Sequence, residues 1–169
     1  MIVLVLGGTR SGKSEVAERL AADLGEPVTF VATAAPSDPE FAARIAEHRR
    51  RRPSNWATIE GDDDLPRIVE RVHGTLLVDS LGPWVARAPE MHVDGEALVK
   101  GLNARSASTV VVSEEVGLSV HPTTDAGRRF ADALGTLNTL VGQVADRALL
   151  VVAGRVVELP PVGDPAGSA

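Results

Sequence analysis

The stretch GGTRSGKS, residues 7–14, decides how the rest of the chain is expected to fold. It matches the pattern G-x-x-x-x-G-K-[ST] in full and ends on Lys13 and Ser14. The apolar run IVLVL (2–6) precedes it, and apolar residues at helical spacing follow it over 13–24. Glycines let successive backbone amides turn inward around phosphate oxygens, and the helix that follows presents the positive end of its dipole to them. The stretch therefore predicts a P-loop at a strand-to-helix turn.

Three side chains are candidates for phosphate and metal chemistry around this loop. Lys13 is expected to reach the β- and γ-phosphates of a nucleoside triphosphate, and the Ser14 hydroxyl is expected to bind Mg²⁺. Asp79 ends the apolar run TLLVD, at the edge of the sheet where open α/β folds bind their ligands. We therefore predict Ser14 and Asp79 as the magnesium ligands. The alternative for Asp79 is a turn or a helix cap.

Short apolar runs alternate with helical patterns along the chain, which is typical of βαβ units and a mainly parallel sheet. Strands are expected at residues 2–6, 28–33, 56–60, 75–80 and 108–113. Helices are expected at residues 13–24, 38–52, 64–72, 94–104 and 125–146. Two further strands, 148–154 and 155–160, meet at a tight Ala153–Gly154 turn and are expected to be antiparallel. The predicted fold class is α/β: a P-loop NTPase-type, mainly parallel sheet flanked by helices, with a C-terminal antiparallel hairpin.

Composition restricts the class of protein. The chain has 169 residues, 44% of them hydrophobic, and a formal net charge of −6, which argues against a general nucleic-acid binder. It has no cysteine, so disulfides and thiolate metal sites are excluded. No signal-peptide pattern opens it and no apolar run is long enough for a membrane span, so we expect a cytoplasmic protein. We expect one nucleotide-binding, catalytic domain over 1–160 and a disordered Pro- and Gly-rich tail over 161–169.

The segment RIAEHRRRRPSNWATIE, residues 44–60, contains a histidine at the border of a helix's apolar face. The arginines that follow His48 suit a helix C-terminus, and such a cluster is also found in small nucleic-acid-binding patches. A third interpretation is chemical. Neutral imidazole is a nucleophile toward phosphorus, and guanidinium groups neutralise a departing pyrophosphate. The residue pattern alone leaves these alternatives open.

Several stretches together resemble one known family. They are GGTRSGKS at 7–14, VAT at 31–33, RIAEHRRRRPSNWATIE at 44–60, LLVDSLGPWV at 76–85, EVGLSVHP at 115–122 and RRFADALGTLN at 128–138. The most specific pattern is H-x-x-x-R-P-x-x-W-x-T-x-E, which is met by His48, Arg52, Pro53, Trp56, Thr58 and Glu60. On these residues the chain resembles the bifunctional adenosylcobinamide kinase/adenosylcobinamide-phosphate guanylyltransferase family of cobalamin biosynthesis.

The resemblance implies two reactions. A nucleotide's γ-phosphate goes to the hydroxyl of adenosylcobinamide, and GMP from GTP then goes to that phosphate through a guanylylated histidine. It implies His48 and Lys13 as catalytic residues, Mg²⁺ as cofactor, GTP and ATP as substrates, a corrinoid as acceptor and a homo-oligomer that is a trimer. The nucleotide contacts that it implies are Gly7, Gly8, Thr9, Arg10, Ser11, Gly12, Lys13, Ser14, Ala32, Thr33, Ala34, Arg49, Arg50, Arg51, Arg52, Glu60 and Asp79.

The chain departs from the family's usual pattern at Glu114, where the family usually has Asn, and at Asp79, where some members carry Glu. Glu114 and Glu115 follow a buried strand at the active edge of the sheet, where one of them could help to activate the substrate hydroxyl; a simple loop role is the alternative. Among the other histidines, His121 is an outside candidate. His73 and His92 are given no role.

Two other functions fit the P-loop. One is a small-molecule kinase that uses ATP without a covalent intermediate. The other is a nucleotide-dependent switch or regulatory ATPase or GTPase with a protein partner. The kinase predicts that phosphoryl transfer survives loss of His48, and the switch predicts slow hydrolysis with no dependence on a corrinoid.

Overall fold

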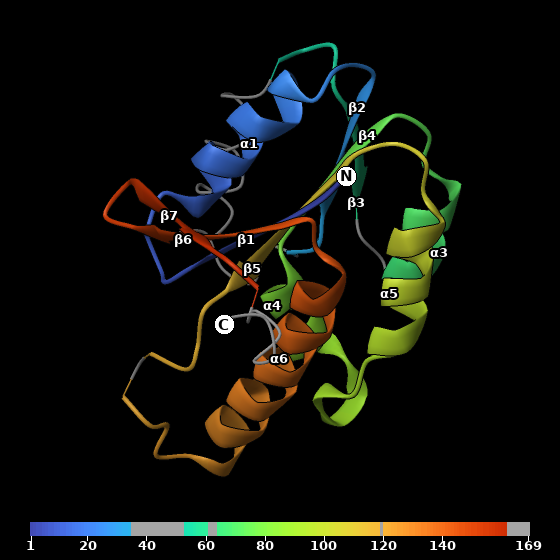
Figure 1. The fold of residues 1–169 in the computed structure, drawn as a ribbon. Coiled ribbons are helices and arrows are strands. Elements are labelled where there is room, and N and C mark those ends of the chain that lie inside the picture. The colour runs from blue at the N-terminus through green and yellow to red at the C-terminus, as the bar shows by residue number, and fades with distance from the viewer. Residues whose placement is uncertain (35–52, 61–63, 119, 162–169) are drawn as a thin grey trace, which may run out of the picture.

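The computed structural model describes residues 1–34, 53–60, 64–118 and 120–161 (Figure 1). The predicted helix at 38–52, which includes His48 and Arg49–Arg52, lies wholly outside these ranges. The tail from 162 onward is also outside them. The predictions for these segments stay predictions.

Within the described residues, seven strands form one sheet in the order β3-β2-β4-β5-β1-β6-β7. Their bounds are β1 Ile2–Gly7, β2 Val28–Ala32, β3 Ala57–Glu60, β4 Thr75–Asp79, β5 Thr109–Glu114, β6 Arg147–Val152 and β7 Arg155–Leu159. Every neighbouring pair is parallel except β6 and β7. The predicted class is confirmed: a mainly parallel α/β sheet that ends in an antiparallel hairpin.

The helices lie on both faces of this sheet (Figure 1). Their bounds are α1 Lys13–Asp23, α3 Leu65–Arg71, α4 Leu81–Arg87, α5 Gly95–Ala104 and α6 Asp125–Val144, with a short 3₁₀ helix η1 over Pro89–Met91. The sequence did not predict α4, because its first turn carries Gly82 and Pro83. Proline is tolerated there, and the helix buries Leu81, Trp84 and Val85 at helical spacing.

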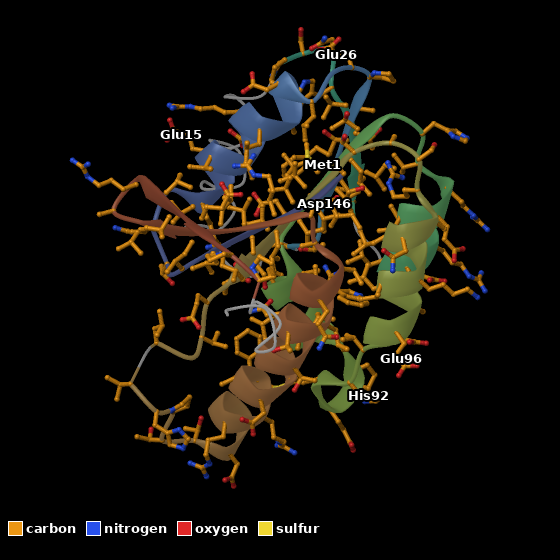
Figure 2. All side chains as sticks on the ribbon, in the orientation of Figure 1. Met1, Glu15, Glu26, His92, Glu96 and Asp146 are labelled. Carbon is orange, nitrogen blue, oxygen red and sulfur yellow. The ribbon has the colours of Figure 1, made fainter. Side chains whose placement is uncertain are left out.

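Two apolar clusters hold the layers together. On one face, Val3 and Val5 of β1 pack with Ala17 and Ala21 of α1. On the other face, Leu4 packs in a cluster with buried leucines of α3–α6. Strands β1, β4 and β5 are buried along nearly their whole length, as their continuous apolar runs indicated. The start of β1 is also tied to β6, since the Ile2 amide donates to Asp146 at 2.6 Å; Asp146 and Met1 lie close together in Figure 2.

Strand β5 ends one residue later than the sequence predicted. Glu114 is its last residue and lies in register with Gly7 of β1. The sequence placed Glu114 in the following loop because a glutamate after an apolar run suggests the end of a strand. Its pairing with the end of the P-loop strand keeps it in the sheet.

A half-buried arginine, Arg105, links α3 to the starts of β4 and β5, at the edge of the sheet opposite the P-loop. The Arg105 guanidinium donates to the carbonyls of Val69, Val72 and Gly74 and to the Thr109 hydroxyl. Burial lowers the pKa of this guanidinium from its usual value. The group stays charged at neutral pH, so these four acceptors depend on one cation.

We expect Arg105→Ala to lower the free energy of unfolding by about 2–4 kcal/mol, because it leaves partly buried carbonyls without donors. Urea denaturation measures this change. Arg71→Ala, which removes an exposed arginine from α3, is the matched control and should change stability by no more than about 0.5 kcal/mol. Equal denaturation midpoints for the two variants would contradict this account of Arg105.

Candidate active site

The predicted P-loop connects β1 to α1 and is held by backbone and side-chain contacts. The Ser11 amide donates to the Gly8 carbonyl at 3.3 Å, and the Ser11 hydroxyl accepts from the Lys13 amide at 3.3 Å. Gly12 precedes α1 with φ of 94°, a conformation that glycine adopts readily. The N-cap residue Gly12 has no side chain to cap this helix, and the Ser11 hydroxyl is the only side-chain acceptor for its first amides within the described residues, so the helix start is suited to an anion.

The loop also contacts the C-terminal hairpin. The Gly154 amide, at the turn between β6 and β7, donates to the Ser11 carbonyl at 2.8 Å. Neither the P-loop motif nor the predicted Ala153–Gly154 turn indicated this contact, because it joins residues that are far apart in the sequence. The hairpin turn therefore supports the phosphate loop.

Gly7 is closely surrounded, whereas Gly8 has free space. A Cβ built on Gly7 would lie 2.5 Å from the Ser11 hydroxyl oxygen and 2.8 Å from the Val151 carbonyl oxygen. A Cβ on Gly8 would meet no atom of the described residues within 4 Å. The Val151 carbonyl belongs to the backbone of the neighbouring strand β6. A side chain at position 7 would therefore require the loop or that strand to move.

We expect Gly7→Ala to destabilise the nucleotide-free protein by about 2 kcal/mol through this overpacking. Gly8→Ala, one residue away, is the matched control and should stay within about 0.5 kcal/mol of the wild type. Thermal unfolding without nucleotide compares the two. A Gly7→Ala variant as stable as Gly8→Ala would mean that the loop does not need this close approach.

Several sequence-predicted residues meet at the carboxyl edge of the parallel strands. Ala32 of β2 is in register with Glu60 of β3 and with Asp79 of β4, and Gly7 is in register with Glu114. Neighbouring strands lie about 4.8 Å apart, so Asp79 is roughly 10 Å from the P-loop strand and Glu60 roughly 19 Å. Asp79 is thus placed near the loop, and Glu60 lies at the far end of the same edge.

Thr33 and Ala34 follow β2 at this edge, and Thr33 is fully buried. The Thr33 hydroxyl accepts from the Ser80 amide at 2.9 Å and also donates to the Ser80 carbonyl. The Thr33 amide donates to the Asp79 carbonyl at 3.2 Å. These contacts fix the turn that carries Asp79, and the roles of Thr33 and Ala34 toward a nucleotide stay predictions.

Lys13 and Glu114 form an ion pair beside the loop. The Lys13 Nζ lies 3.5 Å from Glu114 Oε1 and donates to the Gly8 carbonyl at 3.4 Å. The Lys13 side chain is 12% exposed and that of Glu114 is 27% exposed, so solvent screens the pair only in part. The Glu114 carboxylate also accepts from the Ser80 hydroxyl at 2.8 Å and from the Gly82 amide at 3.0 Å. The predicted phosphate-binding lysine is therefore held over the loop by a carboxylate on β5.

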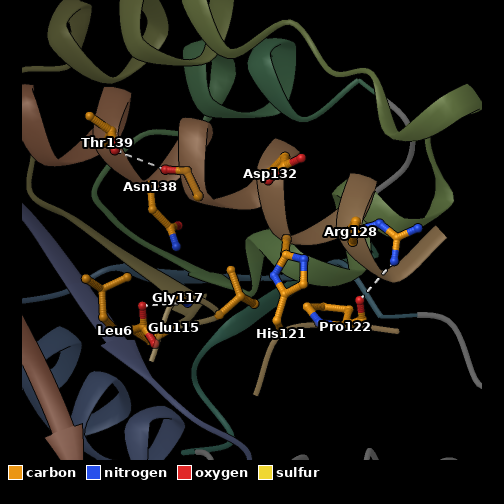
Figure 3. A pocket seen from close by; sticks show the side chains of 12 residues that line it. Leu6, Glu115, Gly117, His121, Pro122, Arg128, Asp132, Asn138 and Thr139 are labelled. Carbon is orange, nitrogen blue, oxygen red and sulfur yellow. Dashed lines mark hydrogen bonds between the residues drawn. The ribbon is translucent and has the colours of Figure 1, made fainter. Parts of the chain in front are cut away.

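A cleft of about 550 Å³ opens between the loop after β5 and α6 (Figure 3). The residues that line it include Leu6, Glu115, His121, Arg128, Asp132 and Asn138. The Glu115 amide donates to the Gly7 carbonyl at 3.1 Å, so the cleft begins where the P-loop strand ends. Its lining combines acidic and basic side chains with apolar ones such as Leu6 and Val116, which suits a ligand arm that has both polar and apolar parts.

The structure therefore brings together Gly7–Ser14, Ala32–Ala34, Asp79 and, at a greater distance, Glu60. It contains no group of three or more His, Asp or Glu side chains that could hold a metal within its described ranges. The Ser14 hydroxyl and the Asp79 carboxylate remain a fitting pair for Mg²⁺, which usually takes few protein ligands and completes its shell with phosphates and waters.

Sequence reasoning missed Ser80, Gly82 and the α6 side of the cleft. The signal for Ser80 was its place directly after the strand that carries Asp79, but serine there is equally typical of a helix start. His121, the outside candidate, lines the cleft, and the exposed His73 and His92 do not; a role for His121 stays a prediction. None of the helices in the described ranges is both long and apolar enough to cross a membrane.

Comparison with known proteins gives one family match that spans most of the chain. Residues 3–159 match the family model described as "Cobinamide kinase / cobinamide phosphate guanyltransferase". The chain is 39% identical to the bifunctional adenosylcobalamin biosynthesis protein CobP of Pseudomonas aeruginosa, over 96% of this chain and 98% of that protein. It is 32% identical to CobU of Escherichia coli, which carries the same description, over 94% and 99% of the two chains.

The fold is also similar to a solved structure of low sequence identity. The flagellar accessory protein FlaH from Methanocaldococcus jannaschii gives a TM-score of 0.53 at 16% identity, over 92% of this chain and 74% of that one. This likeness concerns the fold alone.

Proposed function

The chain belongs to the cobinamide kinase / cobinamide phosphate guanyltransferase family, and we propose that it carries out both reactions. In the first, the γ-phosphate of ATP or GTP goes to the hydroxyl of adenosylcobinamide. In the second, the GMP group of GTP goes to the adenosylcobinamide phosphate and gives adenosylcobinamide-GDP and pyrophosphate.

The observation that carries this proposal is the placement of Lys13. Its amine donates to the Gly8 carbonyl of the loop at the start of α1, at the edge of the sheet where Asp79 ends β4. Such a site favours a chain of phosphates, because amides, helix dipole and amine all attract negative charge. The adjoining cleft supplies space for an acceptor.

Each charged residue of the site has a proposed role toward the phosphates, the metal ion or the nucleoside. Lys13 offsets the charge that develops on the phosphates as a bond to phosphorus breaks, and Arg49–Arg52 are proposed to do the same for pyrophosphate. Ser14 and Asp79 are proposed to hold Mg²⁺, which would neutralise phosphate charge when bound. Glu60, at the far end of the edge, is proposed to orient the ribose or the base.

His48 is proposed as the nucleophile of the second reaction. A nitrogen of its neutral imidazole attacks the α-phosphorus of GTP, the bond to the bridging oxygen breaks, and pyrophosphate leaves with that electron pair. The phosphate oxygen of the acceptor then displaces the histidine from the GMP group. His48 lies outside the described residues, so its place at the site is part of the proposal.

The experiment that tests this function uses GTP labelled at the α-phosphate, with Mg²⁺, followed by a denaturing gel. We expect a protein-bound label that is lost in acid and stable in alkali, as a phosphoramidate is, and that His48→Ala lacks. Lys13→Ala should reduce the label about 100-fold or more, because charge on the leaving group is then not offset.

Assays of phosphate transfer to adenosylcobinamide and of nucleotide hydrolysis distinguish the two other functions, a kinase without a covalent step and a regulatory NTPase. If the wild type phosphorylates adenosylcobinamide while no label forms, the protein is a kinase without a covalent step. If it hydrolyses nucleotide slowly and independently of the corrinoid, it is a regulatory NTPase.

We further propose that the protein is a homo-oligomer, a trimer by family resemblance, and that the β6–β7 hairpin contributes to the subunit contact. Val156 and Val157 of β7 are 47% and 55% exposed, and Leu159 of the same strand is 37% exposed. The hairpin is itself well formed, since Arg147 donates to both Glu158 carboxylate oxygens at 2.9 Å. These hydrogen bonds hold the pKa of the Glu158 carboxyl below its usual value.

Val157→Asp should therefore lower the oligomer's mass toward that of the monomer, because it would bury an unpaired charge in the contact. Light scattering coupled to size exclusion measures the mass. Val120→Asp, at a loop position that is 92% exposed, is the matched control and should leave the mass unchanged. A wild-type monomer, or a Val157→Asp variant of unchanged mass, would contradict the proposed contact.

A further inference from the structure

We propose that Glu114 is the catalytic base of the first reaction: its carboxylate takes the proton of the acceptor hydroxyl as that oxygen attacks the γ-phosphorus. This inference rests on the proposed function, which supplies an alcohol as acceptor and a nucleoside triphosphate as donor.

Glu114 lies beside the expected phosphate site. Its Oε1 is 3.5 Å from Lys13 Nζ. A phosphate oxygen bound by that amine would lie about 2.8 Å from it, and hence no more than about 6 Å from the carboxylate. The carboxylate therefore borders the phosphate site, and the base role requires the attacking oxygen, about 3–3.5 Å from the phosphorus, to approach from the side of Glu114.

The Glu114 carboxylate is also held in one orientation. The Ser80 hydroxyl donates to Oε1 and the Gly82 amide donates to Oε2, so both carboxylate oxygens are held in place. A Cβ at position 82 would collide with this carboxylate, so only glycine leaves room for it there. Each carboxylate oxygen accepts at two lone pairs. When Lys13 turns to the phosphates, the acceptor site that it occupied on Oε1 becomes available to a hydroxyl.

The cleft begins next to Glu114. Asn138 and Glu115 line the cleft, and the Asn138 amide group donates to the Glu114 carbonyl at 3.0 Å. The end of β5 therefore borders the cleft. In the proposed reaction, an acceptor arm extends from the cleft past this end of β5 toward the phosphates.

The step balances with the groups present. The acceptor's O–H bond breaks and its proton goes to Glu114 Oε1, while a bond forms between that oxygen and the γ-phosphorus. The bond from the γ-phosphorus to its bridging oxygen breaks, and the nucleoside diphosphate leaves with the electron pair. In the second reaction the acceptor is a phosphate, which is largely deprotonated at neutral pH and needs no base.

This difference between the two reactions makes the test selective. We expect Glu114→Gln to lower kcat for transfer of labelled phosphate from ATP to adenosylcobinamide about 100-fold. Transfer of GMP to adenosylcobinamide phosphate needs no base, so its kcat should fall at least about 10-fold less than that of the first reaction, even though Glu114 also contacts Lys13. The Kd for ATP should be unchanged or lower, because the variant removes a negative charge near the phosphates. Glu114→Asp should recover part of the lost kcat.

Two further variants keep the test decisive. Ser80→Ala removes one donor that orients Glu114 and should lower kcat of the first reaction alone, by about 10-fold. Glu96→Gln removes an exposed carboxylate on α5, far from the loop in Figure 2, and should change neither reaction.

An unchanged first-step kcat in Glu114→Gln would overturn the proposal, and so would equal losses in both reactions, which indicate a structural role. A wild-type protein that phosphorylates no adenosylcobinamide contradicts the proposed function itself, before any variant is compared, and removes the base with it.

Discussion

The parallel pairing of β1 with β5 is the constraint on which the rest of the site depends. It places Gly7, where the P-loop begins, opposite Glu114, so the loop's lysine meets a carboxylate that is remote in sequence. The same pairing brings the Glu115 amide to the Gly7 carbonyl and sets the cleft beside the loop. A slip of one residue in this register would turn Glu114 to the other face of the sheet. Phosphate loop, carboxylate and cleft are thus placed by one ladder of buried hydrogen bonds.

The type and charge of the residues change along the carboxyl edge of the sheet. Glycine, lysine and exposed helix amides occupy the end near β1, Asp79 lies two strands away, and Glu60 closes the far end at β3. A nucleotide that lays its phosphates on the loop has its base and ribose directed along such an edge. The cleft opens on the α6 side, so in the proposed function the donor and the acceptor would approach from different directions. This division suits a protein that transfers two different groups from nucleotides to one acceptor.

The architecture was accessible from the sequence because its signals were local. The apolar runs of β1, β4 and β5, the glycines of the loop and the helical spacing of α1 and α6 each predict their own element. The Lys13–Glu114 pair was not accessible, since it depends on which strands become neighbours and on β5 continuing through a glutamate. Helix α4 was missed because Gly82 and Pro83 weaken its pattern, while burial of Trp84 supplies the stability that propensity lacks. The cleft is built by side chains of two distant segments, and periodicity carries no information about such shapes.

The hydrogen bond from Gly154 to Ser11 joins the hairpin turn directly to the phosphate loop. The Gly12 backbone packs closely on the same turn, with only 3.4 Å between the Gly154 Cα and an ideal Cβ position on Gly12. Any force that displaces the hairpin is therefore transmitted to the loop through main-chain atoms, which no side-chain substitution removes. If the subunits contact one another through their hairpins, nucleotide binding in one P-loop would affect the P-loops of the neighbouring subunits. Nucleotide binding to the oligomer would then be cooperative, and its saturation curve would show this.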